Sequence, residues 1–337
     1  MKKLAIVILN WNGQHYLEKF LPALLQNIPE YAEVIIADNN STDNSISFLE
    51  SNYPPLRIIQ NGINGGFSKG YNDAFKQINT PYYCLLNSDI EVTPNWVEPI
   101  IELMEANENI AVVQPKILSF YEKEKFEYAG ASGGFVDKLG YPFCRGRIFE
   151  TLEDDKGQHD TPIEIFWATG AAMFVKSDIY HQLGGLDEDF FAHMEEIDFC
   201  WRVKNAGGKI MVNPKSTVYH VGGGTLPKSN SFKTFLNFRN NLFLLLKNLP
   251  AKRLLPTFIA RFPLDILASF IFLLKGNTQD FTAVYKAWRA FLKNYKKMKK
   301  KRNGDFDKGY QALIKTSILF QYHLKQKKYF NGETFHN

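Results

Sequence analysis

Several acidic side chains and one histidine occupy positions in this chain that could be catalytic or bind a metal. Glu195 and Glu196 open a stretch with helical spacing, and His220 follows a run typical of a strand. A carboxylate beside a hydroxyl group can act as a general base, and an imidazole can bind a divalent cation. Asp89 follows an apolar run typical of a buried strand, which places a carboxylate at the end of a strand where ligands of open α/β sheets bind. These residues would suit the transfer of a group away from a negatively charged leaving group.

Each of these residues also has a structural explanation. Acidic residues in a first helical turn favour the macrodipole, and a segment such as Asn87-Ser-Asp89 after a strand can be a turn or a helix cap. Side chains of adjacent helical residues point about 100° apart, so at most one of Glu195 and Glu196 is expected to meet a substrate. Asp198 and Arg202 are four residues apart and are expected to pair as a support on one helix face.

The pattern of the chain around these residues predicts an α/β fold. Strand patterns at residues 4–9, 34–37, 57–59 and 82–86 alternate with helical patterns at 14–27, 43–51, 67–78 and 96–106. This alternation predicts a mostly parallel sheet with helices on both faces. Thr93 and Pro94 are expected to be the N-cap and first residue of the last of these helices.

Polar residues after the predicted strands are candidates for a binding site, because ligands of open α/β sheets bind at the carboxyl ends of the strands. Asp38 ends the second strand, and Asp43 begins the next helix, where it could also be an N-cap. Residues 61–72 form a glycine-rich turn entering a helix, which can bring backbone N–H groups close to a phosphate. That turn matches neither the dinucleotide fingerprint nor the P-loop.

Composition indicates a folded protein in a reducing compartment. The chain has 337 residues with 45% apolar and 22% charged content, enough for one large core or two modest domains. Its three cysteines are odd in number and lack metal-ligand spacing. The first apolar run is short and lacks a cleavage site, so we expect a first strand rather than a signal peptide, and a cytoplasmic protein.

Charge divides the chain into an acidic part and a basic tail. Residues 245–337 hold 19 Lys and Arg against 5 Asp and Glu, a balance of +14, which leaves −9 for residues 1–244. The apolar stretch 254–274 would be long enough to cross a bilayer, but Arg261 and Asp265 lie near its centre and two prolines, Pro256 and Pro263, interrupt it. We therefore expect two amphipathic helices that lie on a membrane surface, and no binding to nucleic acid.

The ordered set of motifs from residue 4 to about residue 250 resembles a family 2 glycosyltransferase and is similar to bacterial rhamnosyltransferase-like enzymes of surface polysaccharide synthesis. The motifs are the Asn64-x-Gly-Phe segment, Asn87-Ser-Asp89, the stretch from Gly170 to Phe191, the Glu195-Glu196 pair and His220. The resemblance implies a GT-A fold over residues 1–244. A nucleotide-sugar half would span 1–113 and an acceptor half 114–244, followed by the basic, aromatic helical tail 245–337.

The resemblance also implies roles for individual residues. Glu196 would be the general base where the family usually has Asp, with Glu195, Asp198 and Arg202 in support. Asp89 and His220 would bind Mn²⁺ or Mg²⁺, with manganese favoured by the imidazole. The residues implied on the nucleotide-sugar side are Asn10, Asp38, Asp43, Asn64, Gly66, Lys69, Gly70, Asn87, Ser88 and Gly170. Asn87 replaces the first Asp of the family's Asp-x-Asp motif, and Lys69 could instead lie on a solvated helix face.

The activity that the resemblance implies is inverting transfer from a UDP- or dTDP-sugar to a glycan or lipid-linked acceptor, at the inner face of the plasma membrane. A sugar nucleotidyltransferase is an alternative, but that class places Arg and Lys in a glycine-rich loop after the first strand, whereas this chain has Asn10-Trp-Asn-Gly. A catalytically inactive glycan-binding or scaffold protein is a second alternative, because Asn87 and Glu196 depart from the family pattern. The donor sugar and the acceptor stay open.

Overall fold

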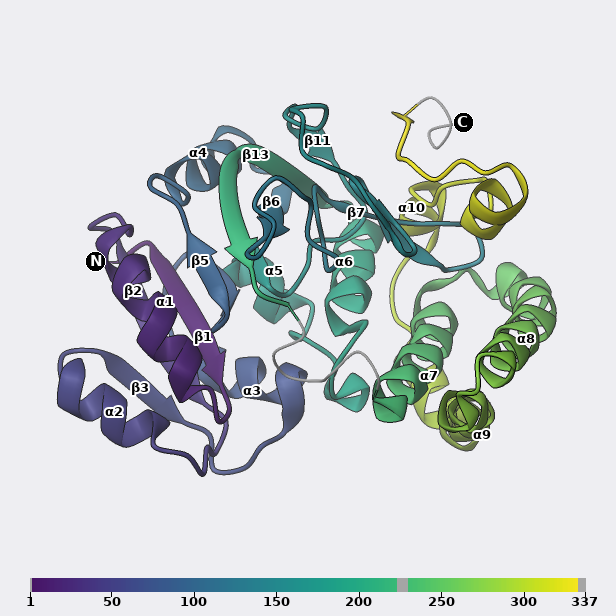
Figure 1. Ribbon diagram of the computed structural model, residues 1–337, viewed down its shortest axis with the longest axis horizontal. Coiled ribbons are helices and arrows are strands. Elements are labelled where there is room, and N and C mark those ends of the chain that lie inside the picture. Colours follow the sequence, from purple (N-terminus) through teal and green to yellow (C-terminus); the bar gives the residue numbers. More distant parts are fainter. Residues whose placement is uncertain (1, 223–229, 333–337) are drawn as a thin grey trace.

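The first half of the chain folds as alternating strands and helices in the computed structural model, which describes residues 2–222 and 230–332 (Figure 1). The elements are β1 (Leu4–Asn10), α1 (Gln14–Gln26), β2 (Ala32–Asp38), α2 (Ser45–Asn52), β3 (Arg57–Gln60), α3 (Gly66–Phe75), β4 (Tyr82–Asn87), β5 (Ile90–Val92) and α4 (Glu98–Ala106). Strands β3, β2, β1 and β4 are parallel neighbours. The carboxyl ends of these four strands therefore lie at one edge of the sheet.

The second half extends this sheet and adds a smaller one. Its elements are β6 (Ile110–Ser119), β7 (Gly134–Val136), β8 (Pro142–Cys144), β9 (Arg147–Ile148), β10 (Thr151–Leu152), β11 (Ile163–Glu164), β12 (Ala172–Lys176), α5 (Ser177–Gln182), a 3-10 helix (Glu188–Phe190), α6 (Glu195–Asn205) and β13 (Lys209–His220). In the described part of the chain the large sheet has nine strands, in the order β11-β13-β6-β12-β4-β1-β2-β3 with β5 beside β13. Strands β10 to β7 form the small antiparallel sheet.

Helices cover both faces of the large sheet because its central strands are apolar on both sides. In β1, Ala5 and Val7 join a core that includes α3, α5 and α6. Leu4, Ile6 and Ile8 face the opposite way and join a core that includes α1, α2 and α4. This two-sided burial is typical of strands in an α/β sheet. The predicted α/β fold, with helices on both faces, is confirmed.

One predicted helix start was wrong. Helix α4 begins at Glu98 rather than after Thr93, because Thr93 Oγ1 donates a hydrogen bond to the carbonyl oxygen of Thr217 at 2.7 Å instead of capping a helix. Asn95 has a φ of 57°, which turns the chain before the helix can start. The tertiary contact with β13 thus overrides the local capping signal.

The C-terminal part is helical and packs against the second half. It comprises α7 (Ser231–Asn248), α8 (Ala251–Leu274), α9 (Thr278–Lys300), α10 (Asp307–Gln311) and a short π-helix (Phe320–Leu324). The division expected between residues 244 and 245 falls inside α7, so cutting the chain there would split a helix. The segment after α10 covers the small sheet, where Ile314 N donates to the carbonyl oxygen of Val136 at 2.9 Å.

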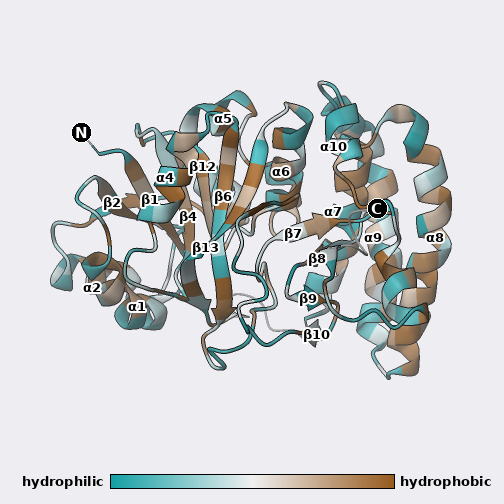
Figure 2. Cartoon of the chain, turned by 90° about the horizontal axis from the view of Figure 1, so that it is seen from above, coloured by the Kyte–Doolittle hydropathy of each residue, from teal (hydrophilic) through white to brown (hydrophobic). Residues whose placement is uncertain are grey.

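Helix α8 has its polar residues inside and its apolar residues outside. The prediction that prolines break this stretch was wrong, because Pro256 and Pro263 lie within one continuous helix of 24 residues. Its buried residues are Thr257, Arg261, Asp265 and Ser269, which recur every four positions and so share one face. Large apolar side chains are exposed on it, namely Leu255, Ile259, Phe262, Leu267, Phe270, Ile271, Leu273 and Leu274. Figure 2 shows α8 at the edge of the molecule with long hydrophobic stretches.

Buried charges attach α8 to the rest of the protein. Arg261 binds Asp265 at 3.1 Å, donates to the carbonyl oxygen of Leu139 at 3.0 Å and lies over the ring of Tyr141. Trp288 of α9 donates to the second oxygen of Asp265 at 3.1 Å. Among the described residues, α8 is the one helix long and apolar enough to cross a bilayer, with a mean hydropathy of 1.8 over 18 residues.

Lys247 of α7 is a second buried charge that joins the helices to the domain. Its Nζ lies 2.6 Å from Asp187 and 2.7 Å from Asp198, and only 4% of its side chain is exposed. Asn248 donates to the other oxygen of Asp198 at 2.8 Å. These contacts outweigh the burial of Asp198 and lower the pKa of that carboxyl.

We predict that Lys247→Met destabilises the protein by about 3–5 kcal/mol, because it leaves two buried carboxylates short of a partner. Lys297→Met is the matched control: the Lys297 side chain, which pairs with Asp189, is 59% exposed, so the change should cost less than about 1 kcal/mol. Urea unfolding followed by tryptophan fluorescence measures both. Equal losses for the two variants would show that Lys247 is no more important than a surface lysine.

Candidate active site

Parallel pairing of β1 with β2 places Asn10 beside Asp38 at the carboxyl edge of the sheet. Asn10 Nδ2 donates to Asp38 Oδ1 at 3.0 Å and to Ser41 Oγ at 3.1 Å. Asp38 also accepts from the backbone N–H of Ser41 at 2.8 Å and from its hydroxyl at 2.6 Å. Asn10 Oδ1 is buried without a hydrogen-bond donor among the described residues. The site therefore has a fixed carboxylate and a spare acceptor.

Asp43 lies in the next loop and is held by backbone groups. It accepts from the N–H of Ser45 at 3.0 Å, from the hydroxyl of Ser45 at 2.6 Å and from the N–H of Gln14 at 3.2 Å. Burial opposes its charge, but these hydrogen bonds outweigh that effect and lower its pKa. The contact with Ser45 near the start of α2 is what the capping alternative predicts, although Asn44 is the residue that precedes the helix.

The N-terminus of α3 comes to the same edge through a group of asparagines. Asn39 Nδ2 donates to Asn64 Oδ1 at 2.9 Å, and that oxygen also accepts from the N–H of Gly66 at 3.0 Å. Gly66 has a φ of 79°, and a Cβ there would lie 2.6 Å from Phe191, so no other residue fits. A Cβ at Gly70 would lie 2.6 Å from the side chain of Leu9. These glycines let α3 approach both β1 and the chain before α6.

Lys69 points along α3 toward Asp73. Its Nζ lies 2.7 Å from Asp73 Oδ2, in an ion pair four residues apart, and Asp73 also binds Lys76. This is the arrangement of a solvated helix face, the structural alternative for Lys69. Nothing in this geometry assigns Lys69 to a ligand.

Asn87, Asp89 and His220 meet where β4, β5 and β13 come together. Antiparallel pairing of β13 with β5 sets His220 opposite Ile90, directly after Asp89. His220 Nε2 lies 3.2 Å from Asp89 Oδ1 and 3.5 Å from Asn87 Nδ2. On its other side, His220 Nδ1 lies 3.4 Å from Glu127 Oε2. Ser88, between Asn87 and Asp89, forms the turn from β4 to β5.

The carboxylates hold His220 in its charged form. Burial alone would lower its pKa, but hydrogen bonds to Asp89 and Glu127 and their charges raise it to about 10. Burial opposes the charge of Asp89, and its contact with His220 outweighs this and lowers the pKa of that carboxyl. The protonated imidazole of His220 thus lies between Asp89 and Glu127 and balances their negative charge, as a bound cation would.

The donor set fits a divalent cation. A carboxylate oxygen and an imidazole nitrogen in contact suit Mn²⁺ better than Mg²⁺. If Nε2 bound the cation, Nδ1–H would remain to donate to Glu127, since metal-bound histidines commonly donate their other ring N–H to a carboxylate. No group of three or more His, Cys, Asp or Glu with metal-site spacing occurs within residues 2–222 and 230–332. Asp89 and His220 would therefore need ligand oxygens to complete the coordination.

Gly170 lies where the chain before β12 packs against β4 and α3. Asn87 N donates to the carbonyl oxygen of Ala171 at 2.9 Å, and a Cβ on Gly170 would lie 2.7 Å from the ring of Phe67. Phe67 N donates to the carbonyl oxygen of Phe191 at 2.9 Å. These contacts link the end of β4, the start of α3 and the segment before α6.

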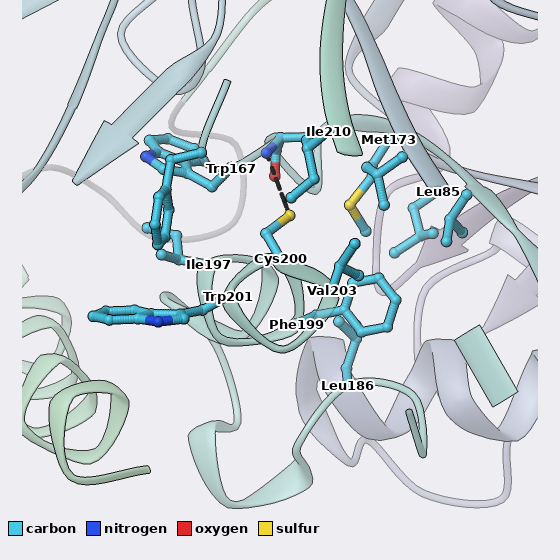
Figure 3. Close-up of a cluster of buried hydrophobic side chains, with 14 of the residues drawn as sticks. Leu85, Trp167, Met173, Leu186, Ile197, Phe199, Cys200, Trp201, Val203 and Ile210 are labelled. Atoms are coloured by element: carbon cyan, nitrogen blue, oxygen red, sulfur yellow. Dashed lines mark hydrogen bonds between the residues drawn. The ribbon is translucent and has the colours of Figure 1, made fainter. Parts of the chain in front are cut away.

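Glu195 and Glu196 begin α6, whose opposite side is anchored in the core. Figure 3 shows Ile197, Cys200, Trp201 and Val203 packed among Trp167, Met173 and Ile210, with Cys200 Sγ at 4.0 Å from the carbonyl oxygen of Ala168. Glu195 is buried and Glu196 half-buried. One carboxyl oxygen of each is buried and accepts no hydrogen bond from the described residues.

This environment disfavours negative charge on the pair. Burial raises the pKa of Glu196 to about 7. Burial and the neighbouring Glu196 together raise the pKa of Glu195 well above its usual range. Neighbouring carboxyl groups with raised pKa values are typical of a proton-transfer site.

The ion pair expected between Asp198 and Arg202 is present. Arg202 Nε lies 2.9 Å from Asp198 Oδ2, and its two terminal nitrogens donate to the carbonyl oxygens of Leu183 at 2.7 Å and Gly185 at 2.8 Å. The pair therefore attaches α6 to the loop that follows α5. Asp198 and Arg202 therefore hold α6 in place and do not line the site.

Sequence reasoning missed several residues of this site. Glu127 lies in a segment with no motif and reaches His220 only through the fold. Asn39 and Ser41 had no predicted role in the site, although their place directly after Asp38 at a strand end could have indicated them. Phe191 ends one of the motifs, but its contact with Gly66 could not be predicted because it depends on the packing of α3.

The sheet topology and the polar groups at its carboxyl edge are those of a glycosyltransferase of the GT-A fold. The family profile described as Glycosyl transferase family 2 matches residues 5–182. The chain belongs to this family. Glu195, Glu196 and His220 lie beyond the matched residues.

Known proteins of several kinds are similar to this chain. An N-acetylglucosaminyl-diphospho-decaprenol L-rhamnosyltransferase of Mycobacterium tuberculosis is 23% identical over 232 residues, 64% of this chain and 75% of that protein. The crystal structure of GalNAc-T7 with UDP, GalNAc and Mn²⁺ has a TM-score of 0.57 at 14% identity and covers 73% of this chain and 48% of that one. The structure of S. aureus TarS 1-349 has a TM-score of 0.51 at 14% identity, covering 98% and 93%.

Proposed function

We propose that this protein transfers a sugar from a nucleoside-diphosphate sugar to a hydroxyl group of a glycan or lipid-linked acceptor, with inversion at the anomeric carbon. The observation that carries the proposal is the Glu195-Glu196 pair at the start of α6. Glu195 is buried and Glu196 half-buried, one carboxyl oxygen of each accepts no hydrogen bond from the described residues, and both pKa values are raised. The rhamnosyltransferase described above, whose name specifies a lipid diphosphate acceptor, supports this substrate class.

The residues at the edge of the sheet would bind the donor. Asp38 and Asp43 would accept hydrogen bonds from the nucleoside of a UDP- or dTDP-sugar, and Asn10, Asn64, Gly66 and Gly70 would shape the surface beside it. The N–H groups of Gly66 and Phe67 at the start of α3 are bonded to Asn64 and to the carbonyl oxygen of Phe191, so the positive end of the helix dipole, rather than these two N–H groups, would favour an anion there. A divalent cation held by Asp89 and His220 would neutralise charge on the diphosphate.

Glu196 would act on the acceptor. Its carboxylate takes the proton of the acceptor hydroxyl while the oxygen forms a bond to the anomeric carbon, and the bond from that carbon to the diphosphate oxygen breaks. Attack from the face opposite the leaving group inverts the configuration. Glu195, whose pKa burial and the neighbouring Glu196 raise well above its usual range, would stay protonated and contribute no second negative charge beside the base.

We also propose that the outward face of α8 lies in the cytoplasmic surface of a membrane. Contiguous exposed apolar surface of this kind is rare on soluble proteins, and the basic residues of the following helix α9 can meet anionic headgroups. The inward Arg261 and Asp265 are bound to the domain, so α8 would lie on the membrane rather than cross it. This placement would bring a lipid-linked acceptor to the enzyme.

We predict that Glu196→Gln lowers the rate of transfer by about 10² to 10⁴ while nucleotide-sugar affinity is nearly unchanged, since the change removes a base and keeps size. In the wild type, activity should fall as the pH drops through about 7, because protonated Glu196 cannot accept the proton. Glu195→Gln is the control and should do less. Steady-state kinetics measures the rate of transfer, and donor titration measures the affinity. A larger loss of rate in Glu195→Gln than in Glu196→Gln would show that Glu195 is the base.

We predict that removing divalent cations abolishes transfer and that Mn²⁺ restores it. Asp89→Asn should weaken the stabilisation that UDP and Mn²⁺ together give in thermal unfolding, with little effect on UDP alone, because the change removes a ligand charge next to His220. Asp73→Asn, which alters an exposed ion pair on α3, is the control. Full activity in excess chelator would rule out the metal.

For the membrane we predict that the protein sediments with vesicles of phosphatidylethanolamine and phosphatidylglycerol. High salt should release only part of it, because apolar insertion is not screened. Ile259→Ser should weaken this binding, whereas Ile63→Ser, at a similarly exposed isoleucine in the first half, should not (65% and 61% exposed). Wild-type protein that stays in the supernatant at low salt, or equal loss from both variants, would contradict the proposal.

A further inference from the structure

The turn that precedes Glu195 is held in a strained conformation. Phe191, His193 and Met194 have φ values of 67°, 68° and 73°, in the left-handed region that non-glycine residues avoid. Each such residue costs on the order of 1–3 kcal/mol and persists only where its surroundings enforce it. Three of them within four residues require a strong external restraint.

Asn240 of α7 supplies that restraint. Its side chain is fully buried, and Nδ2 lies 3.0, 2.9 and 2.7 Å from the carbonyl oxygens of Phe190, Ala192 and His193. Its Oδ1 accepts from Arg239 Nε at 2.9 Å, which fixes the orientation of the amide. One side chain thus gathers three backbone acceptors of the strained turn.

The restraint acts directly on the start of α6. Met194 is the N-cap residue of this helix, and its carbonyl oxygen accepts from the N–H of Asp198 at 2.9 Å in the first helical turn. The backbone direction at Met194 therefore sets where the next two side chains, Glu195 and Glu196, point. On the other side of the turn, Phe67 N binds the carbonyl oxygen of Phe191, so the same turn contacts the start of α3.

We propose that Asn240 is a positioning residue for the catalytic carboxylates: by holding the turn 190–194 through three carbonyl groups, it sets the direction of Glu195 and Glu196 relative to the donor side of the site. This inference rests on the proposed function. It assigns a role in the reaction to a residue of the C-terminal helices, beyond the part of the chain that matches the family profile.

The chain offers a matched control in the next residue. Asn241 is also buried, and its Nδ2 donates to the carbonyl oxygen of Gly140 at 2.7 Å while its Oδ1 accepts from Arg261. It therefore makes similar hydrogen bonds from the same helix, but on the side away from the turn. Asn240→Ala and Asn241→Ala should lose similar stability and differ in their effect on the site.

The kinetic test compares these variants with Asn240→Gln, which keeps the amide on a longer arm. A displacement of about 1 Å can cost about 10²-fold in rate, so Asn240→Ala should lower kcat by one to two orders of magnitude with donor KM and UDP affinity within about twofold. Asn240→Gln should recover part of the rate, and Asn241→Ala should keep kcat within about twofold. Unchanged kcat in Asn240→Ala, or an equal loss in Asn241→Ala, would overturn the proposal.

Hydrogen exchange tests the same proposal without turnover. The backbone N–H groups of residues 191–197 should exchange faster in Asn240→Ala than in the wild type, and at the wild-type rate in Asn241→Ala. If these N–H groups exchange at the same rate in both variants, Asn240 does not hold the turn 190–194, whatever the activity is. If instead the exchange difference is found but the wild type neither transfers nor hydrolyses any nucleotide-sugar, Asn240 does hold the turn and the proposed function is wrong.

Discussion

A single buried carboxylate, Asp198, fixes the positions of α6, α7 and the loop after α5 relative to one another. Arg202 from its own helix, Lys247 and Asn248 from α7 bind its two oxygens, and Arg202 extends the network to the loop after α5. A charge with no exposed surface is tolerated only when it is fully paired, so these elements cannot separate without a large cost. The position of α6, and of the two glutamates at its start, follows from this arrangement.

The candidate site depends on backbone geometry as much as on side chains. Parallel pairing brings Asn10 and Asp38 together, antiparallel pairing brings His220 to Asp89, and a glycine without a side chain lets α3 approach Phe191. The polar groups are then oriented by one another, as in the contacts among Asp38, Asn10 and Ser41. Preorganisation of this kind is the main way in which proteins stabilise charge that develops during a reaction.

Sequence reasoning predicted the parts of the structure that local pattern controls. The first four strands and their helices appear close to their predicted residues, because buried parallel strands form continuous apolar runs. Prediction was wrong where a distant contact decides: Thr93 bonds to β13 instead of capping a helix, and α8 continues through two prolines. Glu127 and Asn240 could not be predicted as neighbours of the site, because only the tertiary fold brings them to His220 and to the turn before α6.

Because α8 turns its polar residues inward and its apolar residues outward, the free energy of this protein depends on what surrounds that helix. Apolar surface left in water costs about 25 cal/mol per Å² relative to burial, and α8 leaves most of its large side chains uncovered. In aqueous solution that surface can be covered only by another apolar surface, and the same helix on a second copy provides one. The purified protein is therefore expected to self-associate through α8 as its concentration rises, and detergent that covers this helix should return it to single chains.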